Sequence, residues 1–520
     1  MARTSRVVEL SDTSHRPILT VPGMRLRALF QGVDLRRQLP DAELEVAALA
    51  YDSRKVVPGG AFFAIHGEKL DGNRFVADAL ERGAAAIASE QPRPATLPPH
   101  VAWVEVVDAR KALAIASANF FGRPAEVLNL IGITGTNGKT TTAYLIDSIL
   151  RGTGRRTGLF GTIQYRTPSA TFPATTTTPE SLDLQAYFAQ VVREGGTHAV
   201  LEASSHALAL DRLWGCSFAV AVFTNLTRDH LDYHKTFEAY FAAKRRLFEG
   251  TGDAAPAVGV INADDAYGEQ LAGLASRTLT YGLRAADIST RKFSLAMSGL
   301  EFVAETPVGR VNVHSPLVGR INVYNILAAI GAAIGLGVET PAIEAGIAQL
   351  AAVPGRFERV DLGQPFLVVV DYAHTDDALR NLLATARELD TAGRVITLFG
   401  CGGDRDRAKR PLMGEAAGRA SDFVVLTSDN PRSEDPLRII NDAVVGLQRS
   451  GLSAQTGADY RIELDRERAI AIALEAARPG DIVLLAGKGH ETYQVLGDRT
   501  IDFDDREFAR RWLRKNGYGS

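Results

Sequence analysis

The chain has 520 residues, a formal net charge of -3, and 46% hydrophobic against 23% charged residues. This balance is typical of a packed globular protein, and it gives no electrostatic reason to expect nucleic acid or an acidic membrane as a partner. Two cysteines, Cys216 and Cys401, argue against a disulfide framework and indicate a reducing compartment. The N-terminus lacks the apolar core of a signal peptide, and no apolar run is long enough to span a membrane. We therefore expect a cytoplasmic protein.

A chain of this length predicts about three domains of ~150 residues each. We expect the first to cover residues 1–127. Its apolar runs at 61–65 and 84–88 are typical of short strands, and residues 73–82 show helical periodicity. A Pro-rich loop follows at 91–100.

The second domain is predicted to cover residues 128–353. Apolar runs at 197–202, 218–225 and 257–262 alternate with helical stretches. This alternation favours a parallel sheet with helices on both faces. Residues 292–314 are instead typical of short antiparallel strands.

Pro354 and Gly355 mark the start of a third domain, residues 354–520. Helical stretches there separate apolar runs at 366–371, 395–399, 423–427 and 482–486. The pattern predicts a second doubly wound, Rossmann-like unit without a phosphate loop of its own. The fold class is therefore α/β with three domains.

Residues 128–142 read L-N-L-I-G-I-T-G-T-N-G-K-T-T-T, which predicts a strand, a phosphate loop and a helix. Gly135 and Gly138 allow backbone N–H groups to turn toward a phosphate, and the helix N-terminus favours the same anion. Lys139 can reach the terminal phosphates, and the hydroxyl of Thr140 can hold Mg²⁺. The loop is shorter than the general phosphate-loop pattern, and the alternative is an ordinary strand-to-helix turn. The placement of Gly-Lys-Thr between strand and helix favours ATP binding.

Polar clusters follow the predicted strands of the second domain, where open α/β sheets bind ligands. Glu202 is placed as a second magnesium ligand, unless it is merely a surface carboxylate. His230 lies between two Asp residues, and either contact with a metal or phosphate or a satisfied loop histidine explains it. Lys244 lies on an amphipathic helix, where a solvated basic face is the simplest interpretation.

Three charged loops follow strands of the third domain: C-G-G-D-R-D-R-A-K-R at 401–410, D-N-P-R at 429–432 and G-K-G-H-E at 487–491. Arginine can grip a carboxylate through two hydrogen bonds, and Asp or Glu can bind an ammonium. Each loop alone could be a turn, but together they predict a site for a zwitterion.

The chain resembles the Mur ligases of peptidoglycan synthesis, and within them the members that add diaminopimelate. The resemblance rests on T-G-T-N-G-K-T-T, E-A-S-S-H-A-L, T-N-L-T-R-D-H-L-D-Y-H, Y-F-A-A-K-R-R-L-F, N-V-Y-N, P-G-R-F-E-R-V, D-Y-A-H-T, G-G-D-R-D and D-N-P-R. These motifs span roughly residues 53–491. The resemblance implies a uridine-nucleotide domain, an ATPase domain and an amino-acid domain, in that order.

The resemblance also implies roles for individual residues. ATP contacts are implied for Gly135, Thr136, Asn137, Gly138, Lys139, Thr140, Thr141, Asn322, Asn325, Arg356 and Asp371. Contacts to the UDP-muramoyl-dipeptide are implied for Ser53, Thr177, Thr178, Ser204 and Arg212. Contacts to diaminopimelate are implied for Arg405, Asp429, Asn430, Pro431, Arg432, Gly487 and Glu491. Lys244 matches a carbamylated lysine, which replaces the solvated-face interpretation. The implied catalytic residues are Lys139, Lys244 and His230, and the implied magnesium ligands are Thr140, Glu202, His230 and the Lys244 carbamate.

The implied reaction joins meso-diaminopimelate to the D-glutamate γ-carboxylate of UDP-N-acetylmuramoyl-L-alanyl-D-glutamate through an acyl phosphate, with ATP and Mg²⁺. Cell-wall synthesis, and through it cell shape and division, depends on such a step, and we expect a monomer. Position 376 is Asp where the family shows Pro, and Leu210 stands where some members place a polar substrate contact. The rivals are a lysine-adding ligase, a folylpolyglutamate synthetase and a non-catalytic nucleotide-binding scaffold. D-N-P-R argues against the first two, and the intact Lys139, Glu202, His230 and Lys244 argue against the third.

Overall fold

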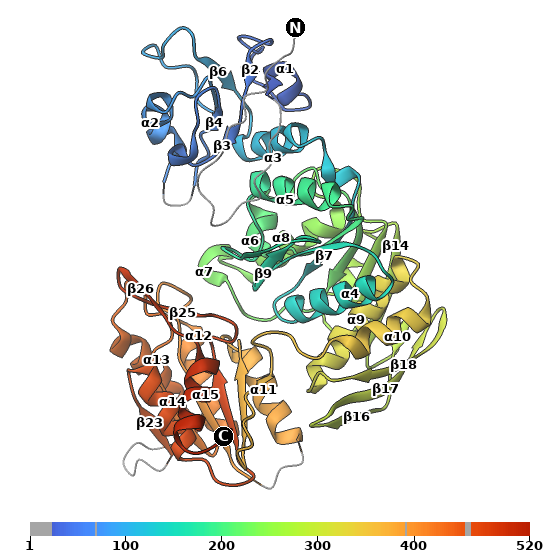
Figure 1. The fold of residues 1–520 in the computed structure, drawn as a ribbon, viewed down its shortest axis with the longest axis vertical. Coiled ribbons are helices and arrows are strands. Elements are labelled where there is room, and N and C mark those ends of the chain that lie inside the picture. Colours follow the sequence, from blue (N-terminus) through green and yellow to red (C-terminus); the bar gives the residue numbers. More distant parts are fainter. Residues whose placement is uncertain (1–22, 68–69, 390–392, 453–458, 520) are drawn as a thin grey trace.

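The computed structural model describes residues 23–67, 70–389, 393–452 and 459–519. Three main sheets follow one another along the chain, and we name the parts built around them the N-terminal, central and C-terminal units. Figure 1 shows the N-terminal unit at one end of the molecule, with the central and C-terminal units next to each other beyond it. The α/β fold class predicted from the sequence is confirmed. The domain boundaries after residues 127 and 353 stay a prediction.

The N-terminal unit contains a four-stranded parallel sheet in the order β3-β4-β5-β6. Its strands are β3 (Leu49–Ala50), β4 (Ala61–Phe63), β5 (Ala86–Ser89) and β6 (Ala102–Glu105), and a small ribbon pairs β1 (Met24–Arg25) with β2 (Glu45–Val46). Helical segments are α1 (Leu26–Leu29), η1 (Ser53–Lys55), η2 (Gly72–Phe75), α2 (Val76–Glu81), α3 (Ala109–Phe120) and η3 (Pro124–Glu126). The predicted strands at 61–65 and 84–88 correspond to β4 and β5.

The central unit contains a twelve-stranded sheet among the described residues, with the order β10-β9-β8-β11-β7-β12-β13-β14-β15-β17-β16 and β18 paired with β17. The parallel strands are β8 (Thr157–Phe160), β11 (His198–Glu202), β7 (Asn129–Thr134), β12 (Phe218–Phe223), β13 (Val258–Asn262), β14 (Arg277–Gly282) and β15 (Ile288–Ser289). The antiparallel strands are β9 (Gln164–Arg166), β10 (Thr171–Pro173), β16 (Phe293–Ala296), β17 (Gly299–Thr306) and β18 (Gly309–Ser315). The antiparallel strands predicted at 292–314 thus extend the parallel sheet through the β15–β17 pair.

Two hydrophobic cores lie on opposite faces of this sheet. In β7, Ile131 and Ile133 contribute to one core and Leu130 to the other, as the alternation of side chains along a strand requires. The first core includes helices α4 (Lys139–Gly152), α9 (Arg320–Gly335) and α10 (Thr340–Gln349). The second includes α5 (Ser181–Arg193), α6 (Ser205–Ala209) and α8 (Phe237–Glu249). The shorter α7 (Leu231–His234) and η4 (Glu269–Leu271) lie in the connections.

The C-terminal unit has a six-stranded sheet in the order β19-β20-β24-β21-β22-β23, parallel except for β19. Its strands are β19 (Glu358–Arg359), β20 (Leu367–Asp371), β21 (Val395–Phe399), β22 (Phe423–Leu426), β23 (Tyr460–Ile462) and β24 (Ile482–Ala486), and β25 (Tyr493–Leu496) pairs with β26 (Arg499–Asp502). Helices α11 (Asp376–Glu388), α12 (Lys409–Ala420) and α13 (Pro436–Arg449) cover one face. Helices α14 (Arg466–Glu475) and α15 (Asp505–Lys515) cover the other.

Polar loops at the carboxyl ends of the parallel strands in both sheets supply the site described below. Within the described ranges, no helix has the length and apolar character needed to cross a membrane.

Candidate nucleotide and amino-acid site

The phosphate loop connects the buried strand β7 to helix α4, as its sequence predicted. Gly135 and Gly138 both have positive φ angles, of 145° and 86°. A Cβ atom would lie 1.8 Å from Thr224 Oγ1 at Gly135 and 2.4 Å from Asn325 Oδ1 at Gly138. Glycine is therefore required at both positions by conformation and by close packing.

Thr140 and Glu202 are in direct contact at the start of α4. The Thr140 hydroxyl donates a hydrogen bond of 2.9 Å to Glu202 Oε1, and Glu202 is only 1% exposed. Thr162 fixes the same carboxylate, its N–H donating to Oε1 at 2.9 Å and its hydroxyl to Oε2 at 3.0 Å. A buried carboxylate beside a hydroxyl is a set of hard oxygen donors that fits Mg²⁺, which keeps waters and phosphate oxygens as its other ligands. Glu202 is thus not the surface carboxylate considered as its alternative.

Two lysines approach the phosphate loop from different helices. Lys139 begins α4, and its Nζ donates to the carbonyls of Gly135 at 3.1 Å and Thr136 at 2.8 Å. Lys244 belongs to α8, is 1% exposed, and its Nζ donates to the Gly135 carbonyl at 2.7 Å. Burial, reinforced by the charge of Lys139, lowers the pKa of Lys244 well below its ordinary value. Lys244 is therefore no part of a solvated basic face.

Asp229 and His230 follow strand β12 and face the C-terminal unit. His230 Nε2 is 3.5 Å from Asp229 Oδ2, and burial lowers the pKa of His230, which favours its neutral form. Burial opposes ionisation of Asp229, but the charge of Lys409 and the hydrogen bond from the His230 backbone N–H hold its pKa below the usual range. His374 and Lys409 of the C-terminal unit each lie 3.9 Å from the Asp229 carboxylate. Among the described residues no three or more His, Cys, Asp or Glu side chains form a metal-binding group, so the assignment of His230 as a metal ligand stays a prediction.

The connection into the C-terminal unit also reaches the phosphate loop. Arg356 Nη2 donates to Thr140 Oγ1 at 3.1 Å, and its guanidinium lies 4.6 Å from the centre of the Tyr372 ring. Asp371 ends β20 and accepts the Phe357 N–H at 2.7 Å. Burial raises the pKa of Asp371, and the Arg356 charge opposes that effect.

A cavity of about 230 Å³ brings most of the predicted nucleotide residues together. Both the central and the C-terminal units line it. Its predicted members are Gly135, Thr136, Asn137, Gly138, Lys139, Thr140, Thr141, Thr177, Glu202, Ser204, His230, Lys244, Asn322, Asn325, Arg356 and Asp371. Asn322 donates to the Val318 carbonyl at 2.7 Å and accepts from Asn325 at 2.8 Å, which fixes both amides at the start of α9.

The remaining residues predicted to bind the dipeptide lie outside this cavity. Thr178 is buried, its hydroxyl donates to the Glu202 carbonyl at 2.6 Å, and its Oγ1 lies 3.0 Å from the hydroxyl of Ser204. Arg212 donates to the Thr178 carbonyl at 2.9 Å. Ser53 is buried in the N-terminal unit at the start of η1. The roles of these residues stay predictions.

A second polar cluster forms where β22 and β24 of the C-terminal unit end. Asn430 Nδ2 donates to Glu491 Oε2 at 2.9 Å. Lys488, fully buried, donates to Glu491 Oε2 at 3.1 Å and to Asn430 Oδ1 at 3.3 Å, and it lies 3.5 Å from Asp429 Oδ1. The Gly487 N–H donates to the Asp371 carbonyl at 3.0 Å, which joins this cluster to the nucleotide cavity.

Arg432 is oriented by backbone carbonyl groups. Its Nη1 donates to the Gly403 carbonyl at 2.8 Å and to the Asn430 carbonyl at 3.3 Å. A Cβ placed on Gly402 would lie within 4 Å of Arg432, Arg405 and Asp429, so the 401–405 and 429–432 loops meet there.

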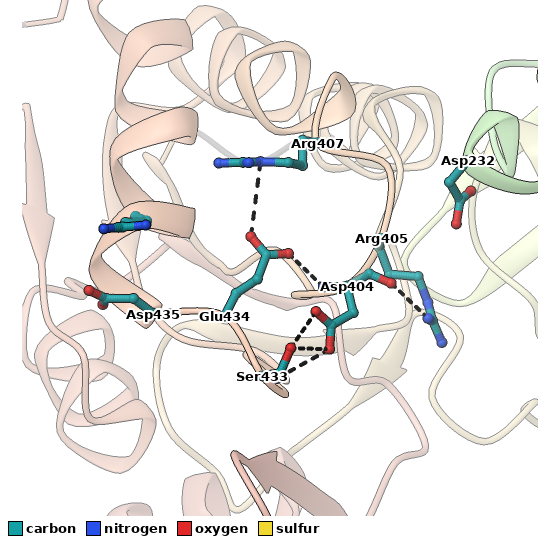
Figure 2. Close-up of a pocket in the computed structure, with 8 residues that line it drawn as sticks. Asp232, Asp404, Arg405, Arg407, Ser433, Glu434 and Asp435 are labelled. Carbon is teal, nitrogen blue, oxygen red and sulfur yellow. Dashed lines mark hydrogen bonds and ion pairs between the residues drawn. The ribbon is translucent and has the colours of Figure 1, made fainter. Parts of the chain in front are cut away.

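Beside these loops lies a second cavity, of about 470 Å³, with charges of both signs. It is lined by Asp232, Asp404, Arg405, Arg407, Ser433, Glu434, Asp435 and Arg438. Figure 2 shows Arg405 pointing away from Glu434, on the side of the cavity where Asp232 of α7 lies. The Arg405 guanidinium donates to the Asp404 carbonyl at 3.0 Å.

The two departures from the family pattern, Asp376 and Leu210, lie at the start of α11 and just after α6. Asp376 is the first residue of α11, where Pro is also favoured and where a carboxylate suits the helix dipole. Thr375 caps the helix by accepting the Ala378 N–H at 3.1 Å. Asp376 therefore starts the helix as Pro would. Leu210 lies half-buried just after α6, outside the nucleotide cavity.

Several site residues were missed at the level of sequence. Lys488 stood inside the quoted G-K-G-H-E motif, and a lysine directly after a buried strand was the available signal. His374 and Lys409 stood inside the quoted motifs D-Y-A-H-T and C-G-G-D-R-D-R-A-K-R, whereas Thr162 had no distinguishing sequence signal. Thr162 approaches Glu202 through the pairing of β8 with β11 in the central sheet, and His374 and Lys409 approach Asp229 through the packing of the C-terminal unit on the central unit.

The chain has three α/β units, and the phosphate loop of the central unit faces a Rossmann-like unit with its own polar cluster. These features define a nucleotide-binding protein of the phosphate-loop class. Family models match nearly the whole architecture: "Mur ligase family, catalytic domain" over residues 45–121, "Mur ligase middle domain" over 133–333 and "Mur ligase, glutamate ligase domain" over 355–489. The chain belongs to the Mur ligase family.

Curated relatives include proteins named UDP-N-acetylmuramoyl-L-alanyl-D-glutamate–2,6-diaminopimelate ligase. The one from Solibacter usitatus is 57% identical over 500 residues, covering 95% of this chain and 99% of the relative. That from Geobacillus kaustophilus is 46% identical over 479 residues, covering 91% and 96%. A solved structure of the same name is 33% identical, with a TM-score of 0.64, covering 95% of this chain and all of the other.

More distant structures share the fold alone. A MurF ligase from Thermotoga maritima in complex with ADP is 18% identical with a TM-score of 0.60, covering 90% of this chain and 98% of the other. A Mycobacterium tuberculosis folylpolyglutamate synthase complexed with ADP and AMPPCP is 19% identical with a TM-score of 0.59, covering 73% and 93%. The fold is therefore common to ligases with different substrates.

Proposed function

We propose that the protein is an ATP-dependent ligase that joins meso-diaminopimelate to the D-glutamate γ-carboxylate of UDP-N-acetylmuramoyl-L-alanyl-D-glutamate in peptidoglycan precursor synthesis. The observation that carries the proposal is the connection of the two polar clusters. The nucleotide cavity contains Asp371, whose carbonyl accepts the N–H of Gly487 at 3.0 Å in the loop that also holds Glu491. The names of the relatives at 57% and 46% identity support the choice of substrates.

The phosphate loop fits ATP as the co-substrate. Only glycine can occupy positions 135 and 138, because a Cβ atom there would collide with Thr224 and Asn325, and a glycine-rich loop before a helix N-terminus is suited to bind phosphate. Thr140 and Glu202 would hold Mg²⁺, which when bound supplies positive charge to the phosphates. Lys139 is placed to add a further charge at the phosphates once it leaves the loop carbonyls.

In the first step a γ-carboxylate oxygen attacks the γ-phosphorus of ATP, the bond to the bridging oxygen breaks, and ADP leaves. This creates an acyl phosphate, which gives the carboxyl carbon a leaving group that a free carboxylate lacks. In the second step the amine nitrogen of diaminopimelate attacks that carbon, phosphate leaves and the nitrogen loses a proton. The protein's task is alignment and charge neutralisation, with no enzyme nucleophile.

Lys244 is proposed to carry a carbamate. A carbamate forms when a neutral amine nitrogen attacks CO₂ and loses a proton, so the lysine must first be uncharged. Burial and the neighbouring Lys139 favour that uncharged form. The product is an anion beside the loop, which offsets the charge of Lys139, the other lysine that donates to the Gly135 carbonyl.

The amino-acid substrate is proposed to bind at Asp429, Asn430, Arg432 and Glu491. Diaminopimelate differs from lysine by a carboxylate at the far end, and a cation is needed to bind it. Arg432 supplies this cation at a fixed position because two backbone carbonyls already orient it. The structural likeness to folylpolyglutamate synthase does not favour that activity, because it extends to the fold alone.

The test is phosphate release by the purified protein with ATP, Mg²⁺, the UDP-muramoyl-dipeptide and each amino acid in turn. We expect release only when the dipeptide is present, and stoichiometric amide product only with diaminopimelate. Equal release without the dipeptide, or amide formation with folate and glutamate, would contradict the proposal.

A further inference from the structure

Asp377 of helix α11 links the C-terminal unit to the phosphate loop. Its Oδ2 accepts hydrogen bonds from Asn137 Nδ2 at 2.7 Å, from Thr227 Oγ1 at 3.3 Å and from Asn381 Nδ2 at 3.3 Å. Asn137 and Thr227 belong to the central unit, whereas Asn381 lies one turn along α11 itself. The Asp377 carboxylate therefore bridges the C-terminal and central units at the loop that faces the nucleotide cavity.

The other groups of Asn137 are fixed within the central unit. Its N–H donates to Asn225 Oδ1 at 2.9 Å, and its carbonyl accepts from Thr224 Oγ1 at 2.6 Å and from Asn225 Nδ2 at 3.1 Å. The side-chain amide is left to Thr227 and Asp377, and the contact to Asp377 is the shorter. A carboxylate acceptor makes this bond stronger than an amide-to-amide bond.

We propose that Asp377 is a positioning residue that docks the C-terminal unit on the phosphate loop, so that the amino-acid cluster is held at a fixed distance from the nucleotide. Where the test uses turnover, the inference rests on the proposed function. Asp377 does not line the nucleotide cavity, whereas its partner Asn137 does, so Asp377 acts through Asn137. The links Arg356–Thr140 and Lys409–Asp229 connect the same units, so Asp377 shares the docking with them.

Asp376 supplies a matched control on the same helix turn. It is acidic like Asp377 and more deeply buried, but its ion-pair partner is Arg380 of its own helix. A general effect of charge at the start of α11 would be the same for both residues. An effect of docking would belong to Asp377 alone.

The test compares Asp377→Ala, Asp377→Asn and Asp376→Ala in the full-length protein. Small-angle X-ray scattering of the free protein should show a wider distribution of dimensions for Asp377→Ala than for wild type and Asp376→Ala. In ligation assays Asp377→Ala should lower kcat about 10- to 100-fold, the effect of losing one hydrogen bond to a charged group that aligns reactants. Asp377→Asn keeps an acceptor oxygen for Asn137, and we expect it to restore part of the rate.

A double-mutant cycle with Asn137→Ala tests whether Asp377 acts through Asn137. If it does, kcat of the double variant should fall no further than kcat of the more impaired single variant. Scattering and kcat for Asp377→Ala that match Asp376→Ala would overturn the inference. Should wild type fail to ligate diaminopimelate, the proposed function would fall, and the scattering comparison would still decide the role of Asp377. Should Asp377→Ala not fold, Asp377→Asn and Asn137→Ala provide the same comparison.

Discussion

Lys139 and Lys244 donate to one and the same carbonyl oxygen, that of Gly135, at 3.1 and 2.7 Å. Two ammonium groups on one acceptor in a buried site repel each other. Burial lowers the pKa of Lys139, and burial together with the Lys139 charge lowers the pKa of Lys244 well below its ordinary value. The pair therefore favours a neutral amine at Lys244. This relationship gives the proposed carbamate a physical cause within the protein.

We predict that Lys244 takes up CO₂. Protein equilibrated with ¹³C-bicarbonate should give one carbamate carbon signal that is absent from Lys244→Ala. Lys244→Ala should be nearly inactive, and formate or acetate should restore part of the rate by supplying an anion. Exposed Lys235, in the loop before α8, is the control, and Lys235→Ala should keep both the signal and the activity. A fully active wild-type protein without the carbamate signal would disprove the prediction.

Lys139→Ala should abolish turnover without unfolding the protein. Loss of one preorganised charge at the reacting phosphate typically costs ~10²–10³ in rate. Circular dichroism and the thermal unfolding midpoint should stay close to wild type, because Lys139 bonds only to carbonyls of its own loop. Phosphate release within a factor of about three of wild type would show that this loop is not catalytic.

Lys488→Met should weaken the amino-acid site while leaving the nucleotide site intact. Lys488 is the fully buried cation beside Asp429 and Glu491, and its removal leaves two carboxylates close together. We expect the KM for diaminopimelate to rise about 10-fold or more, with little change in the KM for ATP. Equal changes in both KM values would indicate general unfolding of the C-terminal unit. A KM for diaminopimelate equal to wild type would remove Lys488 from the site.

Stability should fall in mild acid because buried histidines are held neutral. Burial lowers the pKa of His198 to about 4, with a smaller effect from Arg155. A histidine with a folded pKa below its unfolded value of ~6.5 binds protons preferentially in the unfolded chain, so stability is intact above ~6.5 and lost as the pH falls toward 4. At pH 5 this one group should cost roughly 1–2 kcal/mol.

Urea unfolding at pH 7 and pH 5 measures this loss. His198→Gln should reduce the difference in unfolding free energy between the two pH values, whereas His66→Gln, at an exposed position, should not. Identical pH dependence in wild type and His198→Gln would contradict the assignment.

Much of the fold was readable from the sequence because parallel strands buried on both faces form continuous apolar runs. The runs at 395–399 and 482–486 match β21 and β24 residue for residue. The positions of side chains at strand ends, such as Glu202, were also predictable, because the strands themselves fix the edge of the sheet where ligands bind. The phosphate loop was readable because its glycines are demanded locally by backbone conformation.

Contacts between units were not readable in this way. Nothing in the sequence pairs Asp377 with Asn137, which lies 240 residues earlier, because that contact depends on how two separately folded sheets pack. Nor does the sequence show what orients Arg432, which donates to the Gly403 carbonyl of a loop that follows another strand and to the Asn430 carbonyl of its own loop.

The central claim is tested most directly by competition between meso-diaminopimelate and L-lysine for the same enzyme, dipeptide and ATP, with the products separated by mass. Leaving the Arg432 cation unpaired costs ~2–5 kcal/mol, which corresponds to ~30- to several-thousand-fold in kcat/KM. We predict a ratio of kcat/KM values in this range in favour of diaminopimelate, and a smaller ratio for Arg432→Ala. Comparable kcat/KM values for lysine and diaminopimelate in the wild-type protein would contradict the account and identify a lysine-adding ligase.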